Sequence, residues 1–435
     1  MATWHNWART EVASPRHFDT PGTVDDLARV VAAASDRGER VKAVGAGHSF
    51  TGVAVTDGTL ISLDRMSGIA AVEPTPTGAR VAVQAGTRLR DLGDMLWAQG
   101  LAVPNLGDID VQSLAGAIST GTHGTGGAFP GLAGAVCATT IVLADGRVVD
   151  CSPDHESELF EASRLGLGAL GVLATVTLEC VPAFRLRAEE APSSLQTTLD
   201  ALDELRSGTD HFEFYWFPHT DGVLVKRNTR LPGTTPVRPV GRIRGLVDDE
   251  VLSNGVFALF QEAGTRRPGT IPALNRVASR ALSPRTFVDR SYRVFASARR
   301  VRFREMEYAL PVEHLPEVLR EIDEWLQRND TRVGFPVEVR FAPADDVWLS
   351  TAHGRDTAYV AVHQYHRRDH RPFFDGVEPI LRAAQGRPHW GKLHSLTALE
   401  LREIYPRFDD FLAVRDRVDP GRTFGNPYLR RVLGD

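Results

Sequence analysis

Lysine is almost missing from this chain of 435 residues: of its 50 basic residues, only Lys42, Lys226 and Lys392 are lysines. Arginine therefore stands wherever a general surface cation suffices. The lysine ammonium is a compact point charge on a flexible stem, which arginine does not reproduce. We expect each remaining lysine to be needed as a point charge. Lys392 is the first candidate because it follows His389 and Trp390 in a short polar segment.

Cysteine is also scarce, and its three copies are Cys137, Cys151 and Cys180. An odd number of cysteines without metal-ligand spacing is typical of a reducing compartment. No apolar run reaches the 18 residues that a membrane-spanning helix requires. The first residues also lack the apolar core of a secretory signal. We therefore expect a cytoplasmic protein without a membrane span.

No charge of either sign dominates the chain. The formal net charge is −5, which gives no general argument for nucleic acid as a partner. Hydrophobic residues make up 42% and charged residues 24%, which is ordinary for a soluble globular protein. At 435 residues the chain is too long for one simple core, so we expect about two domains.

The first glycine-rich segment follows a predicted strand over 41–44 and reads Gly45-Ala46-Gly47-His48-Ser49. Backbone N–H groups in such a turn can form an anion-binding nest. A Rossmann phosphate loop must open a helix, but residues 51–63 are rich in β-branched residues and have no helical period. Two interpretations remain: a loop that holds a pyrophosphate between strands, or a tight turn without a ligand.

A second segment, residues 112–126, is rich in glycine, serine and threonine and contains His123. Small residues let the backbone surround a bulky polar ligand closely. The alternative is a loose loop next to a close-packed helix of small residues. Two such segments near each other in the chain favour a cofactor cradle.

The order of predicted elements divides the chain into three parts. Up to residue 182 we expect one α+β unit, with helices over 23–37 and 89–99 and strands over 41–44, 59–63, 80–84, 139–143, 147–150 and 172–179. Residues 183–385 follow with strands over 211–217, 222–227, 301–310, 335–341 and 357–365 and helices over 194–206, 312–329 and 372–384. This second order predicts an antiparallel sheet with helices on one face. Residues 386–435 form a C-terminal segment.

Two strands of the second part alternate polar and apolar residues. Successive side chains of a strand point to opposite faces. Glu338 and Arg340 therefore lie on one face of the first strand, and Tyr359, His363 and Tyr365 lie on one face of the second. If the strands pair, these side chains converge on one side of a sheet whose other side is core. The alternative is a solvated sheet face, the usual position of alternating polar residues.

Four motifs together resemble the vanillyl-alcohol-oxidase-type flavoenzymes. They are Val-Gly-Ala-Gly-His-Ser-Phe (44–50), Gly-Thr-His-Gly-Thr-Gly (121–126), Pro-Val-Glu-Val-Arg-Phe (336–341) and His-Trp-Gly-Lys (389–392). Within these enzymes the chain is similar to the sugar-1,4-lactone (aldonolactone) branch, roughly from Thr10 to Gly434. The resemblance implies an α+β fold: a two-part FAD-binding domain, a cap domain with an antiparallel sheet that contacts substrate, and a C-terminal return to the flavin.

The resemblance also implies which residues form the site. His48 would be bonded covalently to FAD. Glu338, Arg340, Lys392 and His363 would be catalytic, with Glu338 as the best proton acceptor, His363 as the alternative base, and Lys392 or Arg340 stabilising negative charge on the reduced flavin. The other implied cofactor residues are Val44, Gly45, Ala46, Gly47, Ser49, Gly107, Asp108, Ser113, Gly116, Thr120, Gly121, Thr122, His123, Val172 and Tyr365, and Lys392 also counts among them.

The implied reaction is hydride transfer from a carbinol carbon of a sugar-1,4-lactone to FAD. Reoxidation would use O2, giving H2O2, or another electron acceptor such as a cytochrome or quinone. In this superfamily the residue at Gly107 gates oxygen access, and glycine leaves the gate open.

Three alternatives remain: an alditol oxidase, a non-catalytic flavin carrier, and a metal hydrolase. The hydrolase would use His48, His123, His363 and His389, which lack metal-ligand spacing, so we expect no metal. Asp108 stands where alditol oxidases carry a serine, which favours the lactone branch.

Overall fold

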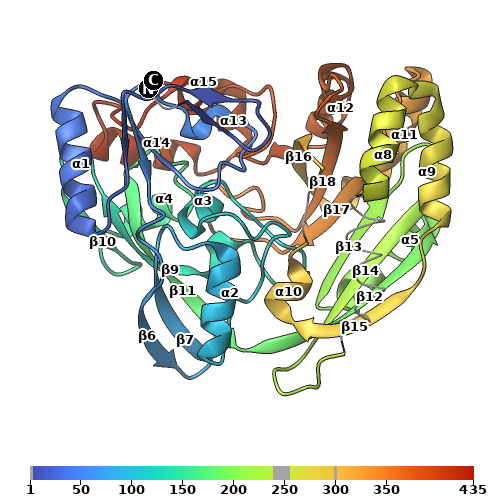
Figure 1. Ribbon diagram of the computed structural model, residues 1–435, viewed down its shortest axis with the longest axis horizontal. Helices are drawn as coiled ribbons and strands as arrows, with labels where there is room; N and C mark the ends of the chain where they lie inside the picture. The colour runs from blue at the N-terminus through green and yellow to red at the C-terminus, as the bar shows by residue number, and fades with distance from the viewer. Residues whose placement is uncertain (1–2, 239–254, 298–300) are drawn as a thin grey trace.

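The computed structural model describes residues 3–238, 255–297 and 301–435. Figure 1 shows two lobes side by side, an N-terminal lobe and a second lobe built on one large sheet. Within the described residues, no helix combines the length and the apolar character needed to cross a bilayer.

The N-terminal lobe contains two main sheets. The strands of the first are β3 (His17–Asp19), β5 (Thr59–Ser62) and β4 (Val41–Val44), which pair in parallel in that order. The second is antiparallel, with the order β10 (Val148–Cys151), β9 (Val136–Val142), β11 (Val172–Pro182), β7 (Gly78–Gln84) and β6 (Ile69–Thr75), and β8 (Leu101–Ala102) pairs with β11. A small ribbon joins β1 (Trp4–His5) and β2 (Val12–Ala13).

The helices of this lobe are α1 (Val24–Asp36), α2 (Leu89–Ala98), α3 (Leu114–Ser119) and α4 (Ser157–Ser163). The sequence predicts α1 and α2 correctly. The Thr23 side chain accepts a hydrogen bond from the Asp26 N–H and so caps α1. Leu27, Val31 and Ala34 follow at helical spacing and are buried.

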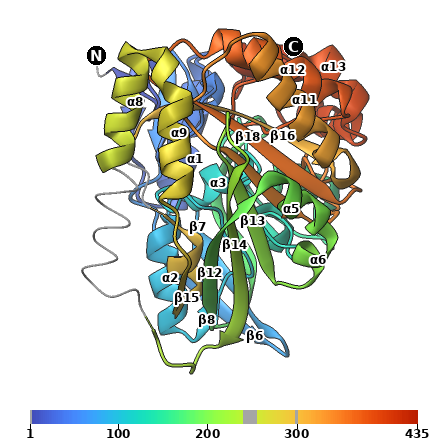
Figure 2. The same ribbon diagram turned by 90° about the vertical axis from the view of Figure 1, so that its right-hand side faces the viewer.

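The second lobe is an eight-stranded antiparallel sheet. Its order is β15 (Arg285–Arg290), β12 (Phe184–Ser194), β14 (Gly222–Pro232), β13 (His211–Trp216), β17 (Val337–Ala342), β18 (Thr357–Tyr365), β16 (Phe303–Pro311) and β19 (Arg387–Pro388). Figure 2 shows helices in front of this sheet, and they include α8 (Phe257–Arg266), α9 (Ile271–Arg280), α11 (Leu315–Arg328) and α12 (Arg371–Ala383). The helix expected over 194–206 is instead two, α5 (Leu195–Asp200) and α6 (Leu202–Ser207), because Ala201 leaves the helical conformation between them. The short α10 (Ser291–Phe295) follows β15.

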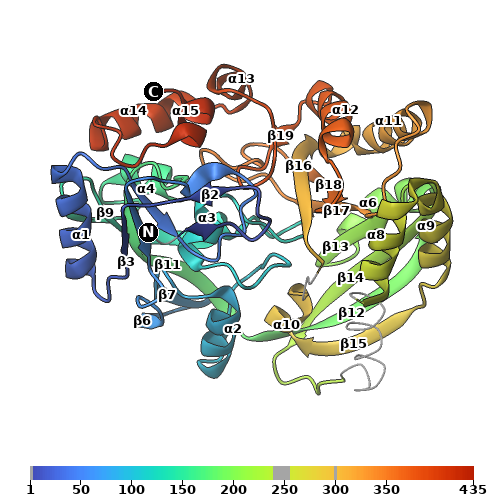
Figure 3. The same ribbon diagram turned by 45° about the horizontal axis from the view of Figure 1, so that its top comes forward.

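The C-terminal helices α13 (Ala398–Ile404), α14 (Phe408–Val418) and α15 (Pro427–Leu433) return to the N-terminal lobe and lie over it in Figure 3. The Val41 N–H donates to the Thr423 carbonyl at 2.8 Å. The Asn426 side chain caps α15 and donates to the carbonyls of Gly52, Val53 and Val55. The strand β19 belongs to the large sheet, although it lies just beyond residue 385. The domain limits 1–182, 183–385 and 386–435 stay a prediction.

Replacing Asn426 with alanine should loosen this C-terminal return. The substitution removes a helix cap and three hydrogen bonds to carbonyls, of which that of Gly52 keeps the Val55 N–H, so the free energy of unfolding should fall by about 2 kcal/mol. Urea denaturation would measure the loss. Asn329→Ala is the control, since exposed Asn329 makes a similar bond to the Trp325 carbonyl at a helix end. Equal stabilities for the two variants would contradict the proposed anchoring.

Candidate active site

A long cavity runs between the glycine-rich segments of the N-terminal lobe, and its space together with its opening to solvent is about 1080 Å³. Gly45 packs so closely on Ser113 that a Cβ there would overlap the serine side chain. Gly47 has a φ of 66°, which glycine adopts without strain. The expected cofactor residues that line this cavity are Val44, Gly45, Ala46, Gly47, His48, Ser49, Ser113, Gly116, Thr120 and Val172. A long wall of backbone and small side chains fits a dinucleotide such as FAD.

The same cavity has a third wall. Of the residues on this wall, the expected cofactor residues included only Val172. Residues 166–168 and 170–173 line it together with the two predicted segments. A signal was present in the sequence, since Gly166, Gly168 and Gly171 alternate with leucine and alanine just before a strand. Gly168 takes a φ of 59°, so the turn uses its conformational freedom.

A second cavity, with an empty volume of about 780 Å³, adjoins the first, and both are lined by His48, Ser49 and Thr120. The other expected site residues on its wall are Gly107, Asp108, Thr122, His123, Glu338, Arg340, His363 and Lys392. Two expected cofactor residues lie elsewhere among the described residues. Gly121 turns the backbone against Leu165 with a φ of 80°. Tyr365 packs in an apolar cluster with Phe50 and Phe303.

The register of the large sheet explains why distant residues meet in the second cavity. Strands β17 and β18 pair so that Arg340 lies opposite Tyr359, and β16 pairs with β18 so that Glu305 lies opposite His363. The predicted convergence of polar side chains on one face is therefore confirmed. This face is buried against the N-terminal lobe rather than solvated, and Val337, Val339 and Phe341 are core on the other face.

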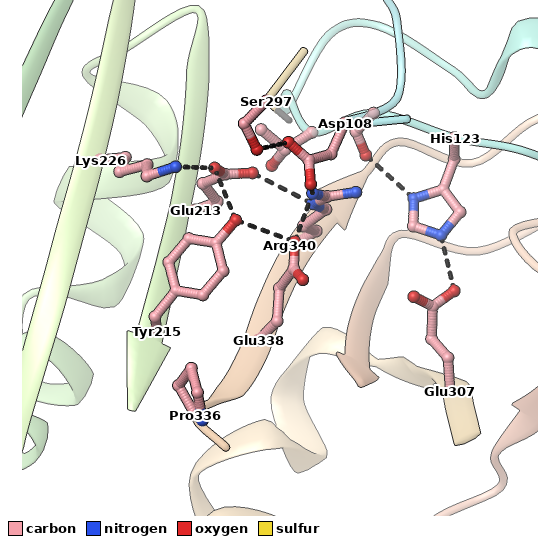
Figure 4. Close-up of polar contacts among 12 residues, drawn as sticks. Asp108, His123, Glu213, Tyr215, Lys226, Ser297, Glu307, Pro336, Glu338 and Arg340 are labelled. Atoms are coloured by element: carbon pink, nitrogen blue, oxygen red, sulfur yellow. Dashed lines mark hydrogen bonds and ion pairs between the residues drawn. The ribbon is translucent and has the colours of Figure 1, made fainter. Parts of the chain in front are cut away.

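Arg340 lies among three acidic side chains (Figure 4). Its Nε donates to Glu213 Oε2 at 3.1 Å, it forms an ion pair with Glu338, and its guanidinium lies 4.0 Å from Asp108 Oδ2. Burial lowers the pKa of Arg340, but Glu338 and Glu213 outweigh burial and hold this pKa well above its usual value. Asp108 belongs to the N-terminal lobe, so Arg340 also joins the two lobes.

Lys392 forms an ion pair with Glu305, whose Oε1 lies 3.5 Å from His363 Nε2. The ammonium also lies 5.3 Å above the Phe50 ring, within the range of a cation–π contact. Burial raises the pKa of Glu305, but Lys392 and His363 outweigh it and keep this pKa below the usual value. Glu305 is therefore a carboxylate that fixes Lys392 beside the cavity.

His123, Glu307 and His389 form a buried cluster whose ligand-type atoms all lie within 4.8 Å of one another. His123 Nδ1 donates to the Gly124 carbonyl at 2.9 Å, and its Nε2 lies 2.8 Å from Glu307 Oε1. Sequence spacing did not reveal this set. His389 Nδ1 accepts from the Gly391 N–H, so the neutral ring carries its proton on Nε2 and presents a donor, not a metal lone pair. The arrangement favours a hydrogen-bonded cluster over a metal site.

His48 lies where the two cavities meet, and its ring stacks on Trp7 with centroids 5.1 Å apart. Burial, with the positive charges of Lys392 and Arg88, lowers the pKa of His48 to about 4. The imidazole is therefore neutral at pH 7, and one of its nitrogens keeps a lone pair.

Sequence reasoning missed four polar residues of this region: Glu213, Tyr215, Glu305 and Glu307. Each pair alternates along its strand, β13 or β16, as Glu338 and Arg340 do along β17. The period was readable in the sequence. The pairing of these strands, which brings the four side chains onto the face of Glu338 and Arg340, was not.

Two sequence comparisons cover most of the chain. Residues 176–432 match the family profile described as D-arabinono-1,4-lactone oxidase, and residues 15–152 match that of an FAD binding domain. The L-gulono-1,4-lactone dehydrogenase of Mycobacterium tuberculosis is 45% identical, with 99% of both chains aligned. An alditol oxidase of a Streptomyces species is 31% identical, with 98% of both chains aligned.

Among solved structures, cholesterol oxidase from B. sterolicum superposes with a TM-score of 0.83 over 99% of this chain and 96% of that chain. The sequence identity is 17%, so this likeness shows the fold alone. The expected fold class, an FAD-binding domain with an α+β cap, is confirmed, and FAD is the cofactor that the matched domain indicates.

The lowered pKa of Glu305 predicts a pH dependence of stability. A carboxylate whose folded pKa is below the usual 4.5 stabilises the protein above that pH, and this contribution is lost as the pH falls through the folded value. Glu305→Gln should therefore be less stable than wild type at pH 7, and the difference should shrink as the pH falls below about 4.5. Denaturation over a pH series measures this, with exposed Glu321→Gln as the control. A difference independent of pH would show that Glu305 is not held as a carboxylate.

Proposed function

Because this chain belongs to the D-arabinono-1,4-lactone oxidase family, we propose that it oxidises a sugar-1,4-lactone, such as L-gulono-, L-galactono- or D-arabinono-1,4-lactone. When bound, FAD supplies the hydride acceptor for a carbinol carbon. Residues 43–49, 113–120 and 166–173 hold it along the first cavity. The observation that carries the proposal is the second cavity, where Glu338, Arg340 and Lys392 meet beside His48.

Glu338 accepts the hydroxyl proton of the substrate in this proposal. The ion pair with Arg340 fixes its carboxylate, and the same guanidinium can also donate to a ring or carbonyl oxygen of the lactone. His363 is a poorer base, since its Nδ1 contacts the Pro336 carbonyl at 3.3 Å and its Nε2 faces Glu305. The geometry therefore supports Glu338 as the general base.

Lys392 supplies positive charge where the reaction leaves negative charge. Its ammonium is held by Glu305 and Phe50, so it does not need to reorganise during the reaction. Trp7, Phe50 and Phe303 form an apolar part of the same wall and reduce access of water. A fixed cation beside a partly apolar wall acts more strongly than one in bulk solvent.

The alditol alternative has less support. The lactone dehydrogenase relative shares 45% of its residues with this chain and the alditol oxidase 31%, over nearly the same length. Asp108 contributes a carboxylate near Arg340, at the position where the resemblance implies a serine in alditol oxidases. A lactone is the better substrate class.

The test is anaerobic reduction of the bound flavin, followed by its absorbance, with lactones and with alditols such as xylitol. Lactones should bleach the flavin faster than alditols. Glu338→Gln and Lys392→Met should each slow the reduction by about 10²-fold, the usual scale for one lost base or electrostatic donor. Preference for xylitol would favour the alditol oxidase, and no bleaching by either class would favour a flavin carrier.

We also predict covalent attachment of FAD to His48, because its neutral ring lies at the junction of the cavities. Denatured wild-type protein should keep its flavin and fluoresce on a gel, whereas His48→Ala should not. Thermal unfolding in parallel shows whether the variant is folded. Release of free flavin from acid-precipitated wild type would contradict the attachment.

Oxygen is the electron acceptor that the open position at Gly107 favours, with H2O2 as its product. A Cβ at Gly107 would lie 3.0 Å from the His123 carbonyl oxygen and from Thr122 Cγ2, so alanine would narrow this part of the cavity. The enzyme reduced by lactone should reoxidise in aerated buffer faster than Gly107→Ala. Equally slow reoxidation of both would favour another acceptor, such as a cytochrome or quinone. A location in the cytoplasm stays a prediction.

A further inference from the structure

Tyr215 stands between two carboxyl groups in the active site. Figure 4 shows contacts from its hydroxyl to both Glu338 and Glu213. The hydroxyl oxygen lies 3.0 Å from Glu338 Oε1 and 3.2 Å from Glu213 Oε1. A phenol has one proton to donate, so it cannot donate to two carboxylates at once. When one glutamate is protonated, it can donate to the Tyr215 oxygen while the phenol donates to the other glutamate. Both hydrogen bonds are then formed. The arrangement is therefore suited to receive and pass on one proton.

The two glutamates face different spaces. Glu338 lines the second cavity, where the substrate would bind. Glu213 lines another small cavity with Glu190, Lys226 and Asn228, in which the space open to water is about 30 Å³ and which borders the second cavity at Asp108 and Arg340. Such a polar space holds about one or two water molecules. Tyr215 thus connects the substrate side of Glu338 with a polar cavity on the other side of the cluster.

We propose that Tyr215 and Glu213 relay the substrate's hydroxyl proton from Glu338 to water in this small cavity. The relay rests on the proposed function, in which Glu338 takes that proton. The O–H bond of protonated Glu338 breaks as the Tyr215 oxygen accepts its proton, and the phenol proton passes to Glu213. Tyr215 begins and ends neutral, Glu213 then releases its proton to water, and no electron moves in these steps.

The charges around Glu213 favour the last step, the release of its proton to water. Lys226 Nζ lies 3.4 Å from Glu213 Oε1 and Arg340 contacts the other oxygen. Burial raises the pKa of Glu213, but Arg340 and Lys226 outweigh burial and lower this pKa, so Glu213 returns to a carboxylate after each transfer. Burial and both glutamates raise the pKa of Tyr215, so the phenol stays protonated between transfers. Among the described residues that line this cavity, Asp108 and Glu190 are the other charged groups beside the cluster.

Infrared difference spectra of the lactone-reduced holoenzyme can locate the proton. After one anaerobic reduction, Tyr215→Phe should keep the proton on Glu338 and show a carboxylic acid C=O band. Wild type should lack the band, and so should the double variant with Glu338→Gln. In Tyr215→Phe the rate of the first flavin reduction should stay within about twofold of wild type. The steady-state turnover rate should fall by about tenfold or more, because Glu338 must be deprotonated before each cycle.

The matched control is Tyr308→Phe. Tyr308 is a buried tyrosine on the other face of the same sheet, where it donates to Glu378. This variant should keep wild-type turnover and show no new band. Glu213→Gln is a second variant that blocks the same relay, so it should lower turnover as Tyr215→Phe does. If Tyr215→Phe folds, reduces normally and turns over at the wild-type rate without the band, the relay is wrong. A wild type that no lactone reduces would instead contradict the proposed function.

Discussion

The site depends on the guanidinium of Arg340, whose side chain is 12% exposed. It contacts Glu213 and Glu338 of the large sheet and approaches Asp108 of the N-terminal lobe, so one side chain aligns the base and joins the lobes. A buried charge is costly unless it is paired, and the removal of one partner leaves the other uncompensated. The position of Glu338 is thus tied to the docking of the two lobes.

The charges around Arg340 extend across the sheet. Arg285, Glu190, Lys226 and Glu213 follow one another on β15, β12, β14 and β13, with Arg285 opposite Glu190, Glu190 opposite Lys226, and Lys226 opposite Glu213. Opposite charges therefore alternate from the edge strand to Arg340. Cross-strand pairs of opposite charge stabilise a sheet, and here each of these four charges has a partner of opposite sign on the next strand.

Scarcity made the lysines informative. Lys42 is 2% exposed and donates to the carbonyls of Gly168 and Phe424, which links the cofactor cradle to the C-terminal segment. Lys226 supports Glu213, and Lys392 pairs with Glu305 beside the substrate cavity. Each of the three lines one of the cavities, and their need as point charges stays a prediction. Burial lowers the pKa of Lys42 to about 7, so this lysine is held mainly by its backbone contacts.

The sequence by itself determined the features that depend on local pattern. Alternation placed Glu338 and Arg340 on one strand face, helical spacing and the Thr23 cap fixed α1, and glycine content marked two walls of the cradle. Only the tertiary structure decided that β13 lies beside β17 and β16 beside β18, which brings Tyr215, Glu213, Glu305 and Glu307 to the same face. Period-two alternation fixes which residues share a face of one strand, but it carries no information about which strand becomes the neighbour. That choice follows from burying the whole apolar face of the sheet at once.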